Sequence, residues 1–533
     1  MKKFFALLIA VLTLSLCLTG CNGVKPLSDV GGEVFSGNGT FAVHKGNYLY
    51  FVNGVGDMSG DNTMGKVEKG ALLRVKKTDI GKSDATYETV IPKLMNTGSA
   101  NSGIYMFGDV VYYGTPYDGK DKTSTIRSDF TDFRTFNLVN AKSSRITFET
   151  SAVKNYSFVE KGDNVYLAYE TTATIDGASV SAYKVLNAKT GKEVFSVDGY
   201  KNLLADDKSG KVFYSKVARN EELEQDEAFD EVYYYTIGDD KAELLFSGCG
   251  SNGLGYDDRS EASYTKKILP YADFSGLTVT LIKKTGSLFV FKVSAIDQNY
   301  GNAYYFGLET SKIDLSKLDL NKAYGTEENP LVEMGMTDAF IDMALTSNAI
   351  YKSLNEIYYV ENSNYLKGLV KFNYNELGGF NHGRTLIANN SEGLNIAFEQ
   401  DGFIYLATTA GVYSRVKIGA GQTEIKRITP VESKSVTAWF VPRVIDNNFI
   451  CVFSGDFYKD YVYVIDIKDI DDETIADGEE ETKYEQYLKK HETATRESVL
   501  ELHATLLGKM TEADKTAFDT KLDKDYPVEE DKE

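Results

Sequence analysis

Short apolar runs rich in tyrosine and β-branched residues recur along the chain, and a polar turn precedes each of them. In the stretch from Leu354 to Phe372, one turn leads into the run Ile357–Val360, and a second turn leads into another short run that ends at Phe372. Paired runs of this kind, separated by turn residues, predict a β-hairpin. Variants of the same turn and strand begin near residues 46, 108, 162, 210, 286, 354, 401 and 446.

These repeats have the spacing of a β-propeller. The steps between turns are 45 to 76 residues, and many units carry a further strand downstream, such as Ala71–Val75, Ala182–Val185 or Val412–Val416. Such units are predicted to form small sheets that bury their faces by stacking on their neighbours. The alternatives are a large β-sandwich or two unrelated β domains, but a sandwich rarely repeats one hairpin so often. We therefore predict an all-β propeller of seven or eight blades, with eight preferred.

The N-terminus has the pattern of an export signal. Lys2 and Lys3 precede the apolar run Phe4–Leu16, which is too short to span a bilayer as a mature helix. The run ends in Leu18-Thr19-Gly20-Cys21, which resembles the lipobox of bacterial lipoproteins. The resemblance implies transfer of diacylglycerol to the Cys21 thiol and cleavage between Gly20 and Cys21. An ordinary secretory signal with a chance cysteine is the alternative.

Composition and charge narrow the range of partners. Hydrophobic residues make up 42% of the chain, with 36 Tyr and 29 Phe, which is ample for a large core. The formal charge of −20 argues against nucleic acid or anionic lipid as a partner. From Lys468 to Glu533 there are 21 acidic and 10 basic residues, so more than half of the excess lies in the last eighth of the chain.

These patterns predict the domain organisation: a signal peptide (1–20), a lipidated tether (21–32), the propeller (33–467), an acidic linker (468–482) and a helical tail (483–533). Within the propeller we expect a solvated loop or a short helix at Asn220–Glu231, a loop at Gly248–Ser263 and an irregular stretch at Asp314–Thr337.

Periodicity predicts that the tail is a hairpin of two helices. The first is expected over Glu485–Leu507, with Gly508 ending it. The second begins at the capping-box sequence Thr511–Asp514, runs through Phe518 and Leu522, and ends at Tyr526-Pro527. The tail is expected to pack on the propeller or to be partly disordered, with a dedicated partner-binding module as the alternative.

The motifs that could carry chemistry are weak, and we assign no catalytic residue, cofactor site or metal site. Gly248–Gly253 matches the dinucleotide fingerprint G-x-G-x-x-G, but no helical pattern follows it. A serine nucleophile would need a histidine base, and the propeller region has only His44 and His382. No pair of carboxylates stands out for glycoside hydrolysis. Cys249 and Cys451 leave a disulfide open.

Two acidic stretches and the tyrosine doublets are further candidates for ligand sites. Asp57–Asn62 and Asp469–Glu473 supply oxygen ligands, so calcium at a blade turn stays open, although neither has the EF-hand spacing. Doublets such as Tyr358-Tyr359 could stack on sugars. However, adjacent strand residues point to opposite faces, so we expect most of them in the packing between blades.

With the repeats laid out, the chain resembles the tyrosine-rich propeller lipoproteins of Firmicutes-type bacteria, which are distantly similar to YWTD propellers. The resemblance covers roughly residues 40–467 and rests on hairpins such as Tyr112–Thr115 and Tyr358–Glu361. A full Tyr-Trp-Thr-Asp occurs nowhere. The resemblance implies the fold and a lipid-anchored location on the extracytoplasmic face of the membrane. It implies no activity, because propellers host many functions.

We therefore expect a non-enzymatic binding or scaffolding protein of the cell envelope, whose partner is an envelope protein or a polysaccharide. Long loops on a rigid scaffold usually carry recognition, so the loop-bearing face is the expected binding surface, with the acidic tail as a second contact. The alternatives are a polysaccharide-acting hydrolase or lyase, and passive glycan binding.

Overall fold

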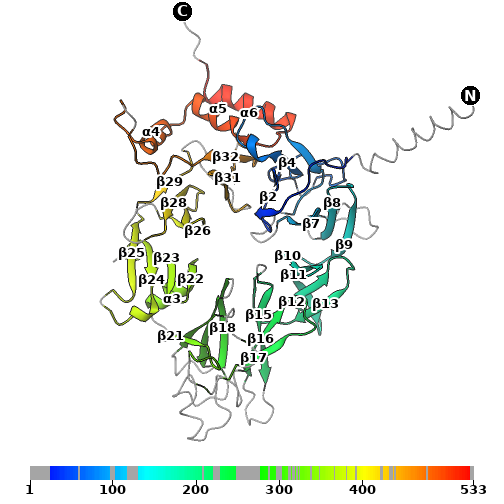
Figure 1. Ribbon diagram of the computed structural model, residues 1–533, viewed down its shortest axis with the longest axis vertical. Coiled ribbons are helices and arrows are strands. Elements are labelled where there is room, and N and C mark those ends of the chain that lie inside the picture. The colour runs from blue at the N-terminus through cyan, green and yellow to red at the C-terminus, as the bar shows by residue number, and fades with distance from the viewer. Residues whose placement is uncertain are drawn as a thin grey trace, which may run out of the picture. The chain divides into compact units, whose positions relative to one another are not determined.

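The predicted turns join neighbouring strands of small antiparallel sheets, and the structure contains eight such sheets (Figure 1). The computed structural model describes residues 24–57, 60–96, 103–116, 130–206, 209–219, 228–247, 277–285, 288–295, 303–309, 314, 318–319, 322, 325–336, 339–346, 348–364, 366–379, 381–390, 393–419, 424–430, 436, 440–455, 457–475 and 478–528. Each sheet is a meander of strands hydrogen-bonded in chain order. The protein is an eight-bladed β-propeller, as the repeats predict.

The first four blades hold the strands up to residue 247. Blade 1 comprises β1 (Val34–Ser36), β2 (Ala42–Lys45), β3 (Tyr48–Val52), β4 (Leu72–Lys76) and β5 (Glu88–Ile91). Blade 2 comprises β6 (Tyr105–Phe107), β7 (Val110–Pro116), β8 (Thr131–Asn137) and β9 (Ser143–Glu149). Blade 3 comprises β10 (Asn155–Lys161), β11 (Asn164–Ile175), β12 (Ala178–Asn187) and β13 (Glu193–Asp198). Blade 4 comprises β14 (Asn202–Asp206), β15 (Lys211–Arg219), β16 (Ala228–Thr236) and β17 (Glu243–Ser247).

The last four blades follow the same plan. Blade 5 comprises β18 (Leu277–Thr285), β19 (Leu288–Ala295), β20 (Ala303–Glu309) and β21 (Val332–Met336). Blade 6 comprises β22 (Ile350–Ser353), β23 (Glu356–Asn362), β24 (Lys367–Phe372) and β25 (Arg384–Asn389). Blade 7 comprises β26 (Asn395–Gln400), β27 (Phe403–Ala407), β28 (Tyr413–Lys417) and β29 (Lys426–Arg427). Blade 8 comprises β30 (Arg443–Ile445), β31 (Asn448–Val452), β32 (Val462–Asp466) and β33 (Leu506–Leu507).

The turn residues explain why the repeat could be found in the sequence. Asp401 and Gly402 have φ of 52° and 80°, and Asp446 and Asn447 have φ of 47° and 63°. Positive φ at both central residues is the geometry of a tight hairpin turn that matches the twist of its strands, and it favours Gly, Asn and Asp. The turn near residue 286 lies outside the described residues, although β18 and β19, which flank it, pair with each other.

The chain divides into two compact units, and the first contains blades 1, 2 and 8 with the C-terminal helices. It comprises Met1–Phe158, Ala407–Arg415 and Lys426–Glu533. One apolar core joins its blades, with members such as Leu49 in blade 1, Val111 in blade 2 and Val452 in blade 8. Burying each such side chain contributes about 1.5–3 kcal/mol, so stacking supplies what a single small sheet lacks.

The second unit, Val159–Leu406 with Val416–Ile425, packs successive blades through a series of cores. Phe213 of blade 4 stacks on Phe289 of blade 5 with ring centroids 4.2 Å apart. The helix α3 (Ala339–Thr346) joins the core between blades 5 and 6. Tyr359 lies in that core, while its neighbour Tyr358 lies in the core between blades 6 and 7. The doublet is thus divided between two blade interfaces, which confirms the expectation from strand alternation.

Two expectations for this unit need correction. The pattern at Asn220–Glu231 predicts a loop or a short helix, but β16 begins at Ala228 and includes the last residues of this stretch. Asp230 is buried there. The Lys201 amine and the backbone N–H of Val279 both donate to its carboxylate at 2.6 Å, which offsets the loss of hydration. The stretch 314–337 was expected to be irregular, but it contains β21, whose pairing with β20 is interrupted by a register shift. The loop expected at 248–263 lies outside the described residues.

The tail is divided differently from the prediction. The single helix expected over 485–507 is instead α4 (Lys483–Lys490), α5 (Arg496–Ala504) and the strand β33. Thr482 and Thr495 each begin a helix with a reciprocal capping box, and the T-x-x-E sequence at 482–485 was the overlooked signal. The last helix, α6 (Glu512–Asp525), begins after Thr511 and buries Phe518 and Leu522, as predicted.

Strand β33 completes blade 8 from beyond residue 467, where the sequence pattern placed the end of the propeller. Leu507 pairs with Val462 of β32 and is fully buried. The described strands of blade 1 all come from residues 34–91, so the first and last blades are joined by packing and loop hydrogen bonds. The Val55 N–H donates to the Asp460 carbonyl at 2.9 Å, and Phe41 meets Phe440 edge to face at 4.8 Å.

Candidate functional site

Residues 24–33, here called the N-terminal segment, lie against blades 1 and 2. The Leu27 N–H donates to the carbonyl of Leu138 in blade 2 at 3.0 Å, and the Gly46 N–H of blade 1 donates to the carbonyl of Glu33 at 3.0 Å. Val24 is only 8% exposed and belongs to the core of the first unit. The folded body of the protein therefore includes the N-terminal segment, beginning at Val24.

Arg74 of β4 fixes the middle of this segment. Its guanidinium is 1% exposed and donates to the Ser28 carbonyl at 2.9 Å and to the Glu88 carboxylate at 2.5–2.6 Å. The guanidinium also lies over the Tyr48 ring, 4.1 Å from its centroid, and within 3.4 Å of the Tyr50 hydroxyl. A planar donor with several N–H groups can satisfy a backbone carbonyl and a carboxylate at once, which a lysine could not do in the same geometry.

Lys45 of β2 fixes the end of the segment. Its amine is 2% exposed and donates to the carbonyls of Val30 and Gly32, with the Asp109 carboxylate 3.5 Å away. Buried cations of this kind need several oxygen partners to offset the loss of hydration. Two buried basic residues of blade 1 thus hold the backbone of the N-terminal segment.

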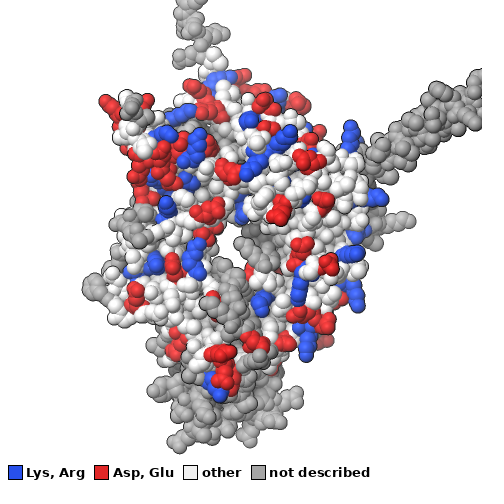
Figure 2. Space-filling model, viewed as in Figure 1, with Lys and Arg blue, Asp and Glu red and all other residues white. Residues whose placement is uncertain are grey.

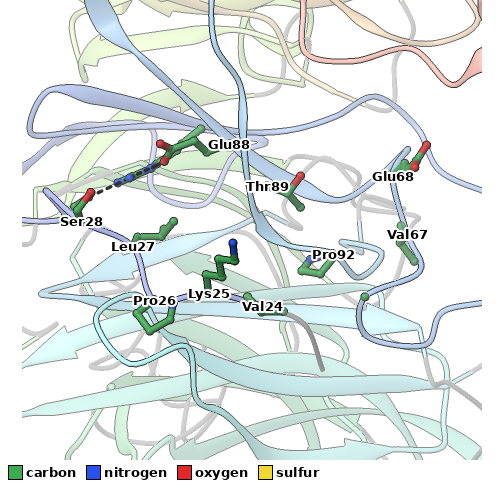
Figure 3. A pocket seen from close by; sticks show the side chains of 12 residues that line it. Val24, Lys25, Pro26, Leu27, Ser28, Val67, Glu68, Glu88, Thr89 and Pro92 are labelled. Carbon is green, nitrogen blue, oxygen red and sulfur yellow. Dashed lines mark hydrogen bonds and ion pairs between the residues drawn. The ribbon is translucent and has the colours of Figure 1, made fainter. Parts of the chain in front are cut away.

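A pocket of about 610 Å³ lies between the segment and the outer part of blade 1 (Figure 3). The pocket is lined by Val24, Lys25, Pro26, Leu27, Ser28, Gly65, Val67, Glu68, Arg74, Glu88, Thr89 and Pro92. Figure 3 shows Glu88 and Ser28 at one side of the pocket, with Lys25 extending into its space. The Arg74 guanidinium bonds to both the Ser28 carbonyl and the Glu88 carboxylate. Because both signs of charge line it, the pocket does not select for a simple anion or cation.

The tail covers the loop end of blades 8 and 1, where β31 connects to β32 and β3 connects to β4. The Asn53 side chain donates to the Lys509 carbonyl at 2.9 Å and accepts from the Lys509 N–H at 3.0 Å. The Tyr461 hydroxyl donates to the Asp514 carboxylate at 2.9 Å, and Lys69 is 3.7 Å from that carboxylate. Burial is the main cause that raises the pKa of Tyr461 to about 12.

Apolar contacts hold the helices α5 and α6 on blade 8. Val499, Phe518 and Leu522 form a small core against Phe457. The His503 ring stacks on Phe518 with centroids 3.8 Å apart, and burial lowers the pKa of this histidine below its usual 6.5. The tail therefore belongs to the first unit, and the expectation that it packs on the propeller is confirmed.

Acidic side chains gather over α4 and the segment before it (Figure 2). The expected oxygen-rich stretch Asp469–Glu473 lies here, and its carboxylates are engaged by cations. Lys483 is 3.2 Å from Asp469 and 3.1 Å from Asp472, and Arg415 is 2.6 Å from Asp471. Among the residues that the structure describes, no group of three or more His, Cys, Asp or Glu side chains is placed to hold a metal ion.

At the loop ends of blades 3 and 4, in the second unit, apolar side chains are exposed. The strands β11 and β12 pair out to Ile175, which is 43% exposed. The strands β15 and β16 pair out to Arg219, and Val217 near this end is 57% exposed. These hairpins present apolar groups on paired strands, where each backbone is already ordered.

The predicted lipidation and cleavage residues, Cys21 and Gly20, lie outside the described residues, as do Cys249 and Gly248–Gly253. His382 lies exposed in its loop with a φ of 52°. Cys451 is buried on β31, and this burial raises its pKa well above the usual value. No helix within the described ranges is long and apolar enough to cross a membrane.

Sequence reasoning missed the roles of Arg74 and Lys45. A signal for Arg74 was present, since the strand that follows the repeated hairpin carries a basic residue in several blades, as in Leu73-Arg74-Val75 and Ser414-Arg415-Val416. In blade 7, Arg415 donates to the Ile467 carbonyl at 2.9 Å, much as Arg74 donates to that of Ser28. In each case a buried arginine, on β4 in blade 1 and on β28 in blade 7, holds a chain segment that passes its blade.

Among the comparisons with known proteins, only the search of solved structures gave matches. No protein-family model matches the chain, and the search of curated proteins found no match. Among solved structures, the β-propeller domain of the Trilobed protease from Pyrococcus furiosus has 8% identity and a TM-score of 0.33, covering 82% of this chain and 98% of its own. An acylaminoacyl peptidase has 8% identity and a TM-score of 0.35, and the match covers 84% of this chain but about half (52%) of the peptidase. The polysaccharide lyase Uly1 has 11% identity and a TM-score of 0.32, covering 85% of this chain and 95% of its own. These distant neighbours are similar in fold, and none of them assigns an activity to this chain.

Proposed function

We propose that this protein is a lipid-anchored, extracytoplasmic propeller that binds or scaffolds another protein at the cell envelope, akin to the tyrosine-rich propeller lipoproteins it resembles. The sequence carries the first part of the proposal, through the basic residues, the short apolar run and the lipobox-like Leu18–Cys21. The proposed anchoring is further supported by the position of Val24, which lies three residues after Cys21 and belongs to the packed core of the first unit.

The binding role is supported by the loop ends of blades 3 and 4. Ile175 and Val217 are exposed apolar side chains on paired strands, which can contact a partner at little cost in backbone entropy. An apolar contact of this kind suits a protein surface, so we take an envelope protein as the partner. The formal charge of −20 further suits a partner without excess negative charge.

The anchoring is tested by metabolic labelling with a radioactive fatty acid in cells that express the full chain. We expect label on the wild type and none on Cys21→Ala, which should leave the membrane fraction. An unlabelled wild-type chain would contradict lipidation, and a labelled Cys21→Ala chain would place the lipid elsewhere.

The binding role is tested by a photo-crosslinking amino acid placed at Val217 and, as a matched control, at Val139. The control is a valine of similar exposure (51%) at the turn between β8 and β9, the opposite end of its blade. A protein adduct from position 217 and none from 139 would support the proposal. Equal adducts would contradict a partner site at 217, and retention by isolated envelope polysaccharide without any protein adduct would favour the glycan-binding alternative.

A further inference from the structure

We infer that the N-terminal segment is a clamp that holds the outer edge of blade 1 against the membrane surface. This edge consists of the pocket lining around Val24 and Gly65–Glu68. The inference rests on the proposed anchoring at Cys21, and it goes further by naming the surface that faces the lipid.

The argument begins with the reach of the chain between the anchor and the body. Only Asn22 and Gly23 separate Cys21 from Val24. Consecutive Cα atoms are about 3.8 Å apart, so the Cα atoms of Cys21 and Val24 cannot be more than about 11 Å apart. A thiol that carries acyl chains in a bilayer would therefore keep Val24 within about that distance of the anchored residue.

The docking of residues 24–33 is what makes this reach short. If the segment were free, the chain between Cys21 and β1 would span up to about 40 Å when extended. Arg74 and Lys45 prevent this, because they hold the carbonyls of Ser28, Val30 and Gly32 from beneath the segment. The docked segment reduces the free reach of the anchor about fourfold.

The short reach also selects which part of the body lies nearest the lipid. Val24 lines the pocket together with Gly65, Val67 and Glu68 of the loop after β3. Lys25 and Lys66 are exposed beside it and can contact lipid headgroups. By contrast, α4 belongs to the same unit, and in Figure 1 the helices α5 and α6 lie between α4 and β4.

The test uses the full mature chain with its lipid, reconstituted into phosphatidylcholine vesicles that carry a headgroup-attached quencher. A fluorescent amino acid is placed at Lys66, next to the clamp, or at Lys489 on α4, which is 72% exposed. We expect quenching at least several-fold greater at position 66 than at 489. A flexible insertion of twenty Gly and Ser residues between Gly23 and Val24 should remove this difference without touching a residue of the fold.

The outcomes separate the clamp from the anchor. The intact mass of the purified chain reports the lipid independently of quenching, and a chain without the lipid mass overturns the anchoring and the clamp together. A lipidated chain with equal quenching at both positions overturns the clamp alone. A difference that persists after the insertion would also overturn it, because the edge would then be held by another contact.

Discussion

Replacing Arg74 with Met should release the N-terminal segment while keeping the apolar stem of the side chain. The charged hydrogen bond to the Ser28 carbonyl contributes about 1.5–3 kcal/mol to docking. The Glu88 carboxylate is 45% exposed, so water screens this pair and it adds less than about 1 kcal/mol. The loss of the cation–π contact with Tyr48 costs about 1 kcal/mol. We therefore expect docking to weaken by about 3 kcal/mol, which raises the undocked population roughly 100-fold.

Hydrogen exchange at single amides measures this change directly. The Leu27 N–H donates to Leu138 only when the segment is docked, so its exchange rate follows the undocked population. In Arg74→Met we expect this rate to rise roughly 100-fold. The Leu49 amide in the core of blade 1 should change far less, because its opening requires the blade itself to unfold.

Two companion variants sharpen the result. Glu88→Gln removes only the half-exposed partner and should raise Leu27 exchange less than about tenfold. Arg74→Lys keeps the charge but loses the second hydrogen bond, so it should fall between the two variants. If Arg74→Met left Leu27 exchange unchanged, Arg74 would not be what holds the segment. If Leu49 exchange rose equally, the effect would be global unfolding rather than release of the clamp.

Three further changes test other contacts. Asp132 in β8 is fully buried and accepts from Arg134 at 2.7 Å and Arg145 at 2.8 Å, so Asp132→Asn should cost about 1.5–3 kcal/mol and lower the urea midpoint. Asp163→Asn, at an exposed turn, is the control, and an equal midpoint for both variants would contradict the assignment. A chain ending at Ile467 lacks β33, so it should melt at a lower temperature and aggregate through the unpaired edge of β32. A chain ending at Lys509 keeps that strand and is the control. Equal melting temperatures for the two chains would refute a structural role for β33. Because burial lowers the pKa of His503 in the folded chain, this histidine binds a proton at a higher pH when the chain is unfolded. The tail should therefore have its full stability above pH 6.5, and its stability should fall as the pH drops below 6.5. His503→Phe should flatten this dependence of the urea midpoint, and an unchanged slope would contradict it.

The sequence by itself determined the repeating part of the fold. The repeated hairpins have strands that alternate between two apolar faces, and many of their turns need positive φ, and both requirements are local. Turns such as Asp401-Gly402 and doublets such as Tyr358-Tyr359 therefore carried enough information to predict eight blades and the burial of the tyrosines. The start of α6 was likewise visible, because a cap is formed by Thr511 and its own neighbours.

The tertiary structure decided how the two ends of the chain are used. Strand β33 joins β32 across a separation of more than 40 residues. In the sequence its two leucines fit the end of a helix, and only the pairing with β32 makes them a strand. The N-terminal segment has no strand or helix pattern of its own from residue 24 to 33, because its hydrogen bonds go to Leu138, Gly46 and the buried cations of blade 1. Such contacts depend on which groups the folded blades bring to one place, and no local pattern in the sequence encodes that placement.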